Sequence, residues 1–200
     1  MTLLSLLMIL VRWSHLLFGI AWIGMLYYFN FVQGGYFKAA TPEALKDAKA
    51  KLAPSALWWF RWGAMFTFIT GLVLLGYVHA NGQLNGYIIM GALLATIMFL
   101  NVWLVIWPNQ KIALGIVQGG DAAAAGAKAA LASRHNVLFS GPMALGMLAG
   151  VLAYVELTPG IDDWIKANAQ GEMTLPSVTG LPMGWFALAF IAFLVFAGWG

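Results

Sequence analysis

The chain has 200 residues, of which 62% are hydrophobic and 8% charged, and its formal net charge is +3 at pH 7. This composition excludes an ordinary soluble domain and predicts an integral membrane protein. The small basic excess bears on membrane topology, and no nucleic-acid role is indicated. The chain has no cysteine, so it lacks disulfides, thiolate metal sites and covalently attached haem of the Cys-x-x-Cys-His type.

The first predicted span, residues 3–31, places an arginine and a histidine in a segment otherwise apolar and long enough to cross a bilayer. It is too long for a signal-peptide core, so we expect it to be retained. Ionisable groups inside a membrane are costly and normally face protein, a cofactor or water. His15 therefore either hydrogen-bonds a neighbouring helix or binds a ligand. At helical periodicity one face carries Met8, Arg12, His15, Gly19, Trp22 and Leu26.

Four more spans are predicted after the first one. The second begins with tryptophans around Arg61, which is typical of a headgroup boundary, and the third is expected to stop at Pro108. The expected fold is an all-α integral membrane protein, a five-helix transmembrane bundle forming a single membrane domain over residues 1–200. The five spans are residues 3–31, 55–79, 87–107, 135–156 and 183–200.

The loops between these spans are expected to contain short interfacial helices. Residues 41–53 have Thr41 as a helix cap with Pro42 in the first turn, and residues 161–169 form a second candidate. Small residues at four-residue spacing inside the spans predict close contact with other helices. These small-residue stripes are Gly63, Thr67 and Gly71 in the second span and Gly146 and Gly150 in the fourth.

Basic residues are concentrated in two of the loops. By the positive-inside rule this distribution places the N-terminus outside and the C-terminus in the cytoplasm. We therefore expect a multi-pass protein of the bacterial inner membrane. The residues concerned are Lys38, Lys46, Lys49 and Lys51 in the first loop, and Lys111, Lys128 and Arg134 in the third.

None of the seven acidic residues lies in the middle of a predicted span. This excludes a paired-carboxylate acid–base site, a carboxylate-bridged di-metal site and a proton pump based on a buried acid. Arg12 and Arg61 therefore have no intramembrane carboxylate partner. Either they extend to lipid phosphates, or they bind haem propionates, an anionic substrate or another subunit.

The three histidines are the remaining candidate cofactor ligands. His15 lies near the middle of its span, whereas His79 and His135 lie near span ends. Two axial ligands of one haem must lie at the same depth, so ligation by His15 and His135 requires the span boundaries to shift. A methionine is the alternative second ligand. For His79 and His135, solvation at the interface is the competing interpretation.

Four segments also carry a family resemblance as a set. They are RWSHLLFGIAWIG (12–24), WFRWGAMFTFITG (59–71), NVWLVIWPNQK (101–111) and RHNVLFSGPMALGM (134–147). In this order they resemble the N-terminal membrane domain of the bacterial membrane-bound urate oxidase (urate hydroxylase) family. The first segment is more distantly similar to copper-resistance-D-type and haem-biosynthetic membrane oxidoreductases, in which such a helix is associated with haem.

The resemblance implies a redox-linked membrane protein in which His15 and His135 are candidate ligands of haem b iron. The family enzyme has more spans and a C-terminal cytochrome c domain. We therefore expect this chain to pass electrons within a larger assembly, with other membrane subunits, further copies of itself or an external cytochrome c as partners. The other positions carried over as cofactor-binding candidates are Arg12, Trp22, Arg61, Arg134 and Asn136.

The alternative is a non-catalytic accessory subunit that packs against a membrane enzyme through the small-residue stripes. A transporter is less favoured, because no hydropathy repeat relates the two halves of the chain.

Overall fold

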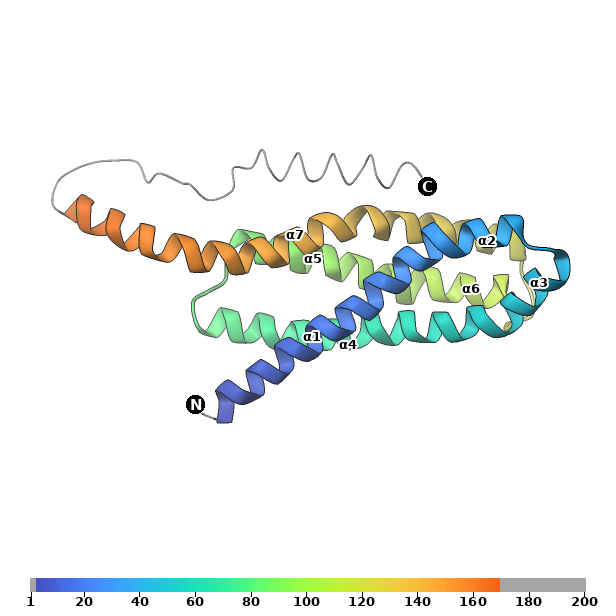
Figure 1. The fold of residues 1–200 in the computed structure, drawn as a ribbon, viewed down its shortest axis with the longest axis horizontal. Coiled ribbons are helices and arrows are strands. Elements are labelled where there is room, and N and C mark those ends of the chain that lie inside the picture. Colours follow the sequence, from blue (N-terminus) through green and yellow to red (C-terminus); the bar gives the residue numbers. More distant parts are fainter. Residues whose placement is uncertain (1–2, 170–200) are drawn as a thin grey trace.

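All regular structure in the described part of the chain is helical (Figure 1). This computed structural model describes the backbone of residues 3–169 and the side chains of residues 3–149. The predicted all-α class is confirmed for this part. Three helices are long and apolar enough to cross a membrane, and they correspond to the first three predicted spans: Leu3–Ala39, Pro42–Ala80 and Gly86–Ala113.

The first of these helices is longer than predicted. It consists of α1 (Leu3–Tyr27), the π-helical turn η1 (Tyr28–Gln33) and α2 (Gly34–Ala39), so it continues beyond residue 31. A π-helical turn pairs backbone groups five residues apart and mostly occurs as a single turn inside an α-helix. Here the side-chain amide of Asn30 also donates to the Leu26 carbonyl at 2.8 Å. The helix therefore passes through this turn without ending.

The interfacial helix predicted for residues 41–53 is not a separate helix. Its cap is confirmed, because the Thr41 hydroxyl accepts a bond from the Ala44 amide at 3.4 Å. However, α3 (Pro42–Asp47) and the π-helical turn η2 (Ala48–Leu52) continue directly into α4 (Ala53–Ala80). Pro54 follows this π-helical turn, which shifts the backbone pairing where the proline has no N–H to donate.

The third helix does not stop at Pro108 as predicted. It begins with α5 (Gly86–Leu100) after a turn in which Gly82 has a φ of +67°. The π-helical turn η3 (Asn101–Ile106) then leads into α6 (Trp107–Ala113), and Pro108 lies in the first turn of α6. Proline has no N–H to donate, but the π-helical turn just before Pro108 shifts the backbone pairing at this point, and the helix continues to Ala113.

One long helix, α7 (Ala122–Ala169), includes the fourth predicted span. Asp121 caps it, since one carboxylate oxygen accepts bonds from the Ala123 and Ala124 amides at 2.8 and 3.1 Å. The interfacial helix predicted for residues 161–169 is the end of α7 and not a separate element. The fifth predicted span, residues 183–200, lies outside the described residues, so the count of five spans stays a prediction.

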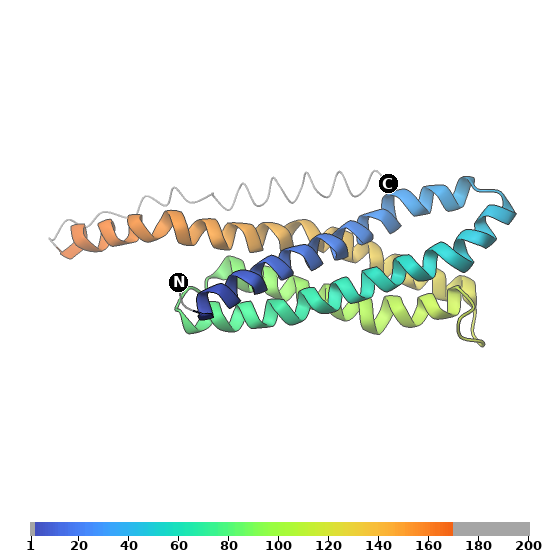
Figure 2. The ribbon, with the colours of Figure 1, turned by 60° about the horizontal axis from the view of Figure 1, so that its bottom comes forward.

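The helices form two closely packed pairs, α1 with α4 and α5 with α7, and contacts between the pairs are fewer (Figures 1 and 2). Glycines permit both close approaches. A Cβ at Gly63 would lie 3.1 Å from the backbone nitrogen of Trp22, and one at Gly146 would lie 3.1 Å from the Cα of Gly91. These members of the predicted stripes therefore contact helices of the same chain.

Candidate intramembrane ligand pocket

An apolar pocket of about 690 Å³ lies between the two helix pairs. Its volume falls within the roughly 300–1,000 Å³ that is usual for small-molecule and cofactor sites. All four long helices contribute to its walls, and many of the wall residues are glycine or alanine. The side chains that carry polar or sulfur atoms into the walls are His15, Trp22, Thr67, Thr96, Met143 and Met147.

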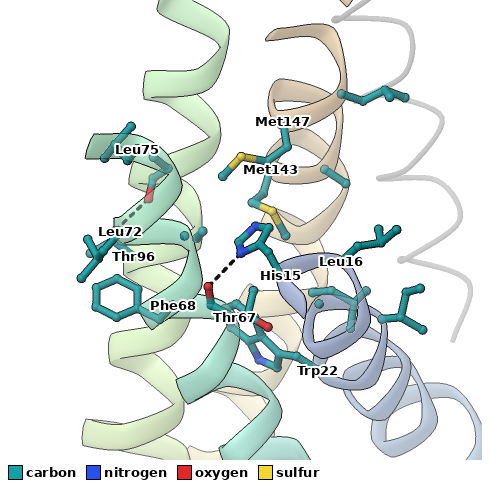
Figure 3. Close-up of a pocket in the computed structure, with 18 of the residues that line it drawn as sticks. His15, Leu16, Trp22, Thr67, Phe68, Leu72, Leu75, Thr96, Met143 and Met147 are labelled. Carbon is teal, nitrogen blue, oxygen red and sulfur yellow. Dashed lines mark hydrogen bonds between the residues drawn. The ribbon is translucent and has the colours of Figure 1, made fainter. Parts of the chain in front are cut away.

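The imidazole of His15 is fixed by α4 (Figure 3). Its Nδ1 lies 3.0 Å from the Thr67 carbonyl oxygen and 3.1 Å from the Thr70 hydroxyl. Because a carbonyl only accepts, this arrangement assigns the proton to Nδ1 and leaves the lone pair on Nε2. Nε2 has no hydrogen-bond partner among the described residues. One nitrogen therefore anchors the ring, and the other is available to a ligand.

Gly71 gives the imidazole its position against α4. A Cβ at Gly71 would lie 3.1 Å from Cε1 and 3.5 Å from Nδ1 of His15. Even a methyl group at this position would therefore press on the ring. The sequence singled out Gly71 only as part of a small-residue stripe, and its contact with His15 was not predicted.

Two methionines line the same pocket from the opposite helix pair. Met143 and Met147 are one turn apart on α7, and Met143 is buried. Figure 3 shows both methionine side chains extending from α7 into the pocket, near the His15 ring. Thioether sulfur is a soft ligand that pairs with histidine on haem iron in some proteins. The four-residue spacing of these methionines is the only sequence signal that could have singled them out, and it is weak.

Trp22 contributes an unpaired hydrogen-bond donor to the pocket wall. Its side chain is 1% exposed, and the indole Nε1 has no hydrogen-bond partner among the residues whose side chains are described. Buried polar groups normally have partners, so an unpaired donor in a cavity wall needs an explanation. An acceptor atom on a molecule occupying the pocket would satisfy it.

The two arginines predicted as site residues do not line this pocket. Arg12 is exposed, and its guanidinium carbon lies 5.7 Å from the centre of the Tyr77 ring. The guanidinium carbon of Arg61 lies 3.3 Å from the centre of the Trp107 ring. The structure therefore directs both cations to aromatic rings away from His15.

His135 also lies away from the pocket. It is exposed, and its Nδ1 bonds to the Leu131 carbonyl of its own helix at 2.9 Å. At a rise of 1.5 Å per residue, His135 is about 12 Å along α7 from Met143. The structure thus does not bring His15 and His135 together. His79 is exposed as well, and residues 3–149 contain no cluster of three His, Cys, Asp or Glu side chains that could hold a metal ion.

Asn136 connects helices and does not line the pocket, and its neighbour Arg134 is exposed. Asn136 is fully buried, donates to the Met98 carbonyl at 2.9 Å and accepts from the Asn101 amide at 3.0 Å. Both partners belong to the α5–η3 helix. The side chain therefore ties α7 to that helix, which is a structural role.

A family model described as urate oxidase N-terminal matches residues 76–165. Two of the four resembling segments, residues 101–111 and 134–147, lie within this range, and the other two lie outside it. The matched region includes α5 and the two methionines but not His15. No curated protein and no solved structure matches the chain. The predicted resemblance to the urate oxidase N-terminal family is thus confirmed over residues 76–165, somewhat less than half of the chain.

Proposed function

We propose that the chain is a membrane-integral, redox-linked protein of the urate-oxidase membrane-domain type that binds haem b through His15. The observation that carries this proposal is the anchoring of Nδ1 by the Thr67 carbonyl, with Nε2 left unpaired beside the pocket. Histidines that bind metals typically donate their other ring N–H to a carbonyl or carboxylate in this way. If His15 only joined two helices, a cavity beside its unpaired Nε2 would have no role in that contact.

Three properties of the pocket fit haem. Its volume and apolar walls suit a large flat macrocycle. Its donor set combines an imidazole with the thioethers of Met143 and Met147, one of the ligand pairs used for haem iron. The unpaired indole N–H of Trp22 can donate to a carboxylate oxygen, which haem carries on its propionates.

Each group of the chain has a role in this proposal. Haem supplies one-electron redox chemistry when it is bound. The Thr67 carbonyl fixes the tautomer and orientation of His15. The apolar walls exclude water from the ligand, and a thioether partner favours a higher reduction potential than a second imidazole does.

The alternative function, a non-catalytic accessory subunit, was motivated by the small-residue stripes. Gly63, Gly71 and Gly146 of these stripes contact helices within the chain. They are therefore not available as an outer packing face, and the pocket supports the redox proposal better. We further infer an inner-membrane location with the N-terminus outside, from the loop charges. The electron partner is then another membrane subunit or an external cytochrome c.

The proposal is tested by the haem content of the full chain purified from its membrane. We expect a Soret absorbance band and haem b by pyridine extraction, both lost in His15→Ala. His135→Ala is the matched control and should retain the pigment, because His135 is exposed and bonded within its own helix. Absence of a Soret band from the wild-type protein, or full retention of haem in His15→Ala, would refute the proposal.

A further inference from the structure

Two cations share one indole ring at the α6 end of the bundle. The guanidinium carbon of Arg61, on α4, lies 3.3 Å from the centre of the Trp107 ring, and Nζ of Lys111 lies 5.5 Å from the same point. We call these three residues the cation–tryptophan cluster. Cations are attracted to the face of an indole, but two cations on one ring also repel each other. The cluster therefore favours an anion that neutralises both.

Among residues 3–149, no carboxylate supplies that negative charge. The one salt bridge among the side chains that the structure describes joins Lys51 and Asp47. Arg61 uses its Nε to donate to the Leu57 carbonyl at 3.2 Å, and its other four N–H donors have no partner in the described part of the chain. Stacking on Trp107 holds the guanidinium plane and leaves its edge available.

Exposed tryptophans surround Arg61 along α4. Trp58, Trp59 and Trp62 are 49%, 58% and 37% exposed, and their rings contact one another. Tryptophan is enriched in membrane proteins at the boundary between the headgroups and the acyl chains. Figure 1 shows α2, α3 and α6 at the same end of the molecule, so the lysines of the first loop are also there. The exposed tryptophans and the nearby lysines are together typical of a headgroup boundary.

We propose that the cation–tryptophan cluster binds the phosphate of an anionic phospholipid headgroup. Arginine offers a planar fork that can bind two phosphate oxygens, and lysine adds a second positive charge. A zwitterionic lipid brings its own cation close to Arg61 and Lys111, so it is disfavoured relative to an anionic one. The proposal concerns residues outside the pocket and is independent of haem binding.

Native mass spectrometry of the full chain in detergent, titrated with phosphatidylglycerol or phosphatidylcholine, tests the proposal. We expect tighter binding of phosphatidylglycerol by the wild-type protein. Each of Arg61→Gln and Lys111→Gln should weaken it about fivefold, since one interfacial cation contributes about 1 kcal/mol. Lys128→Gln is the matched control: it removes the same charge from an exposed lysine of α7 and should change binding less than twofold.

Two further results separate a headgroup site from other causes. Excess inorganic phosphate should leave phosphatidylglycerol bound, because the lipid also contacts the exposed tryptophans; displacement would identify a free-phosphate site and overturn the proposal. An equal loss in Lys128→Gln would indicate general charge attraction and would also overturn it. If Arg61→Gln does not fold, Lys111→Gln decides the matter, and unchanged phosphatidylglycerol binding in that variant contradicts the proposal.

Discussion

Replacing Gly146 by alanine should separate α7 from α5. A Cβ at Gly146 would lie 2.9 Å from the Tyr87 carbonyl oxygen and 3.0 Å from the Gly91 nitrogen. Both are backbone atoms of α5, so neither can move away by changing a rotamer. Ordinary contact begins at 3.4 Å, and the two helices must therefore move apart by about 0.5 Å at this point.

Two effects of opposite sign determine how Gly146→Ala changes the free energy of unfolding. Inserting a methyl group into a well-packed contact costs about 1–3 kcal/mol. Replacing glycine by alanine inside a helix contributes up to about 1 kcal/mol in the stabilising direction. Gly76 on α4 isolates the second effect, because a Cβ there meets nothing within 4 Å. We therefore expect Gly146→Ala to be less stable than Gly76→Ala by about 1–3 kcal/mol.

The measurement is the free energy of unfolding in mixed micelles, followed by circular dichroism during a denaturant titration. Gly76→Ala should be as stable as the wild-type protein or slightly more so, and Gly146→Ala less stable. Equal stability of the two variants would mean that α5 and α7 do not pack at Gly146 as described. The reasoning about close-packed helix pairs would then be refuted.

Three further substitutions test other contacts. Asn136→Ala removes the bonds to the Met98 carbonyl and the Asn101 side-chain amide and should lower the free energy of unfolding by about 1–3 kcal/mol in the same titration. Tyr27→Phe removes the 2.9 Å bond to the Ser140 hydroxyl and should cost about 1 kcal/mol; no loss of stability would show that this bond contributes nothing. Gly71→Ala presses on the His15 ring, so it should shift the Soret maximum and the reduction potential of the purified protein, whereas Gly76→Ala should shift neither.

Local patterns in the sequence predicted much of the helical structure. The face predicted for α1 is confirmed at Met8, Trp22 and Leu26, which are all buried, because helical periodicity depends only on nearby residues. Arg12 was assigned to the same face but is exposed. Its long side chain extends toward Tyr77, so its charged group lies away from the apolar interior.

The errors at helix ends also have a local cause. The sequence predicts that Pro108 ends the third span, but Pro108 lies in the first turn of a segment that follows a π-helical turn, as Pro54 also does. Hydropathy does not reveal such turns. The pairing of helices could not be predicted either, since it depends on contacts between distant residues. For this reason the sequence indicates His15 as a candidate ligand, but it does not predict that Gly71 and Met143 lie next to His15.

The two helix pairs also set an order of assembly. Each pair is formed by spans that follow one another in the chain, α1 with α4 and then α5 with α7. During synthesis, the first hairpin can therefore insert and close before the second has left the ribosome. His15 is positioned at that early stage, but the opposite wall does not yet exist. A ligand that needs both walls of the pocket, such as the one proposed above, could therefore be bound only after the second hairpin docks onto the first.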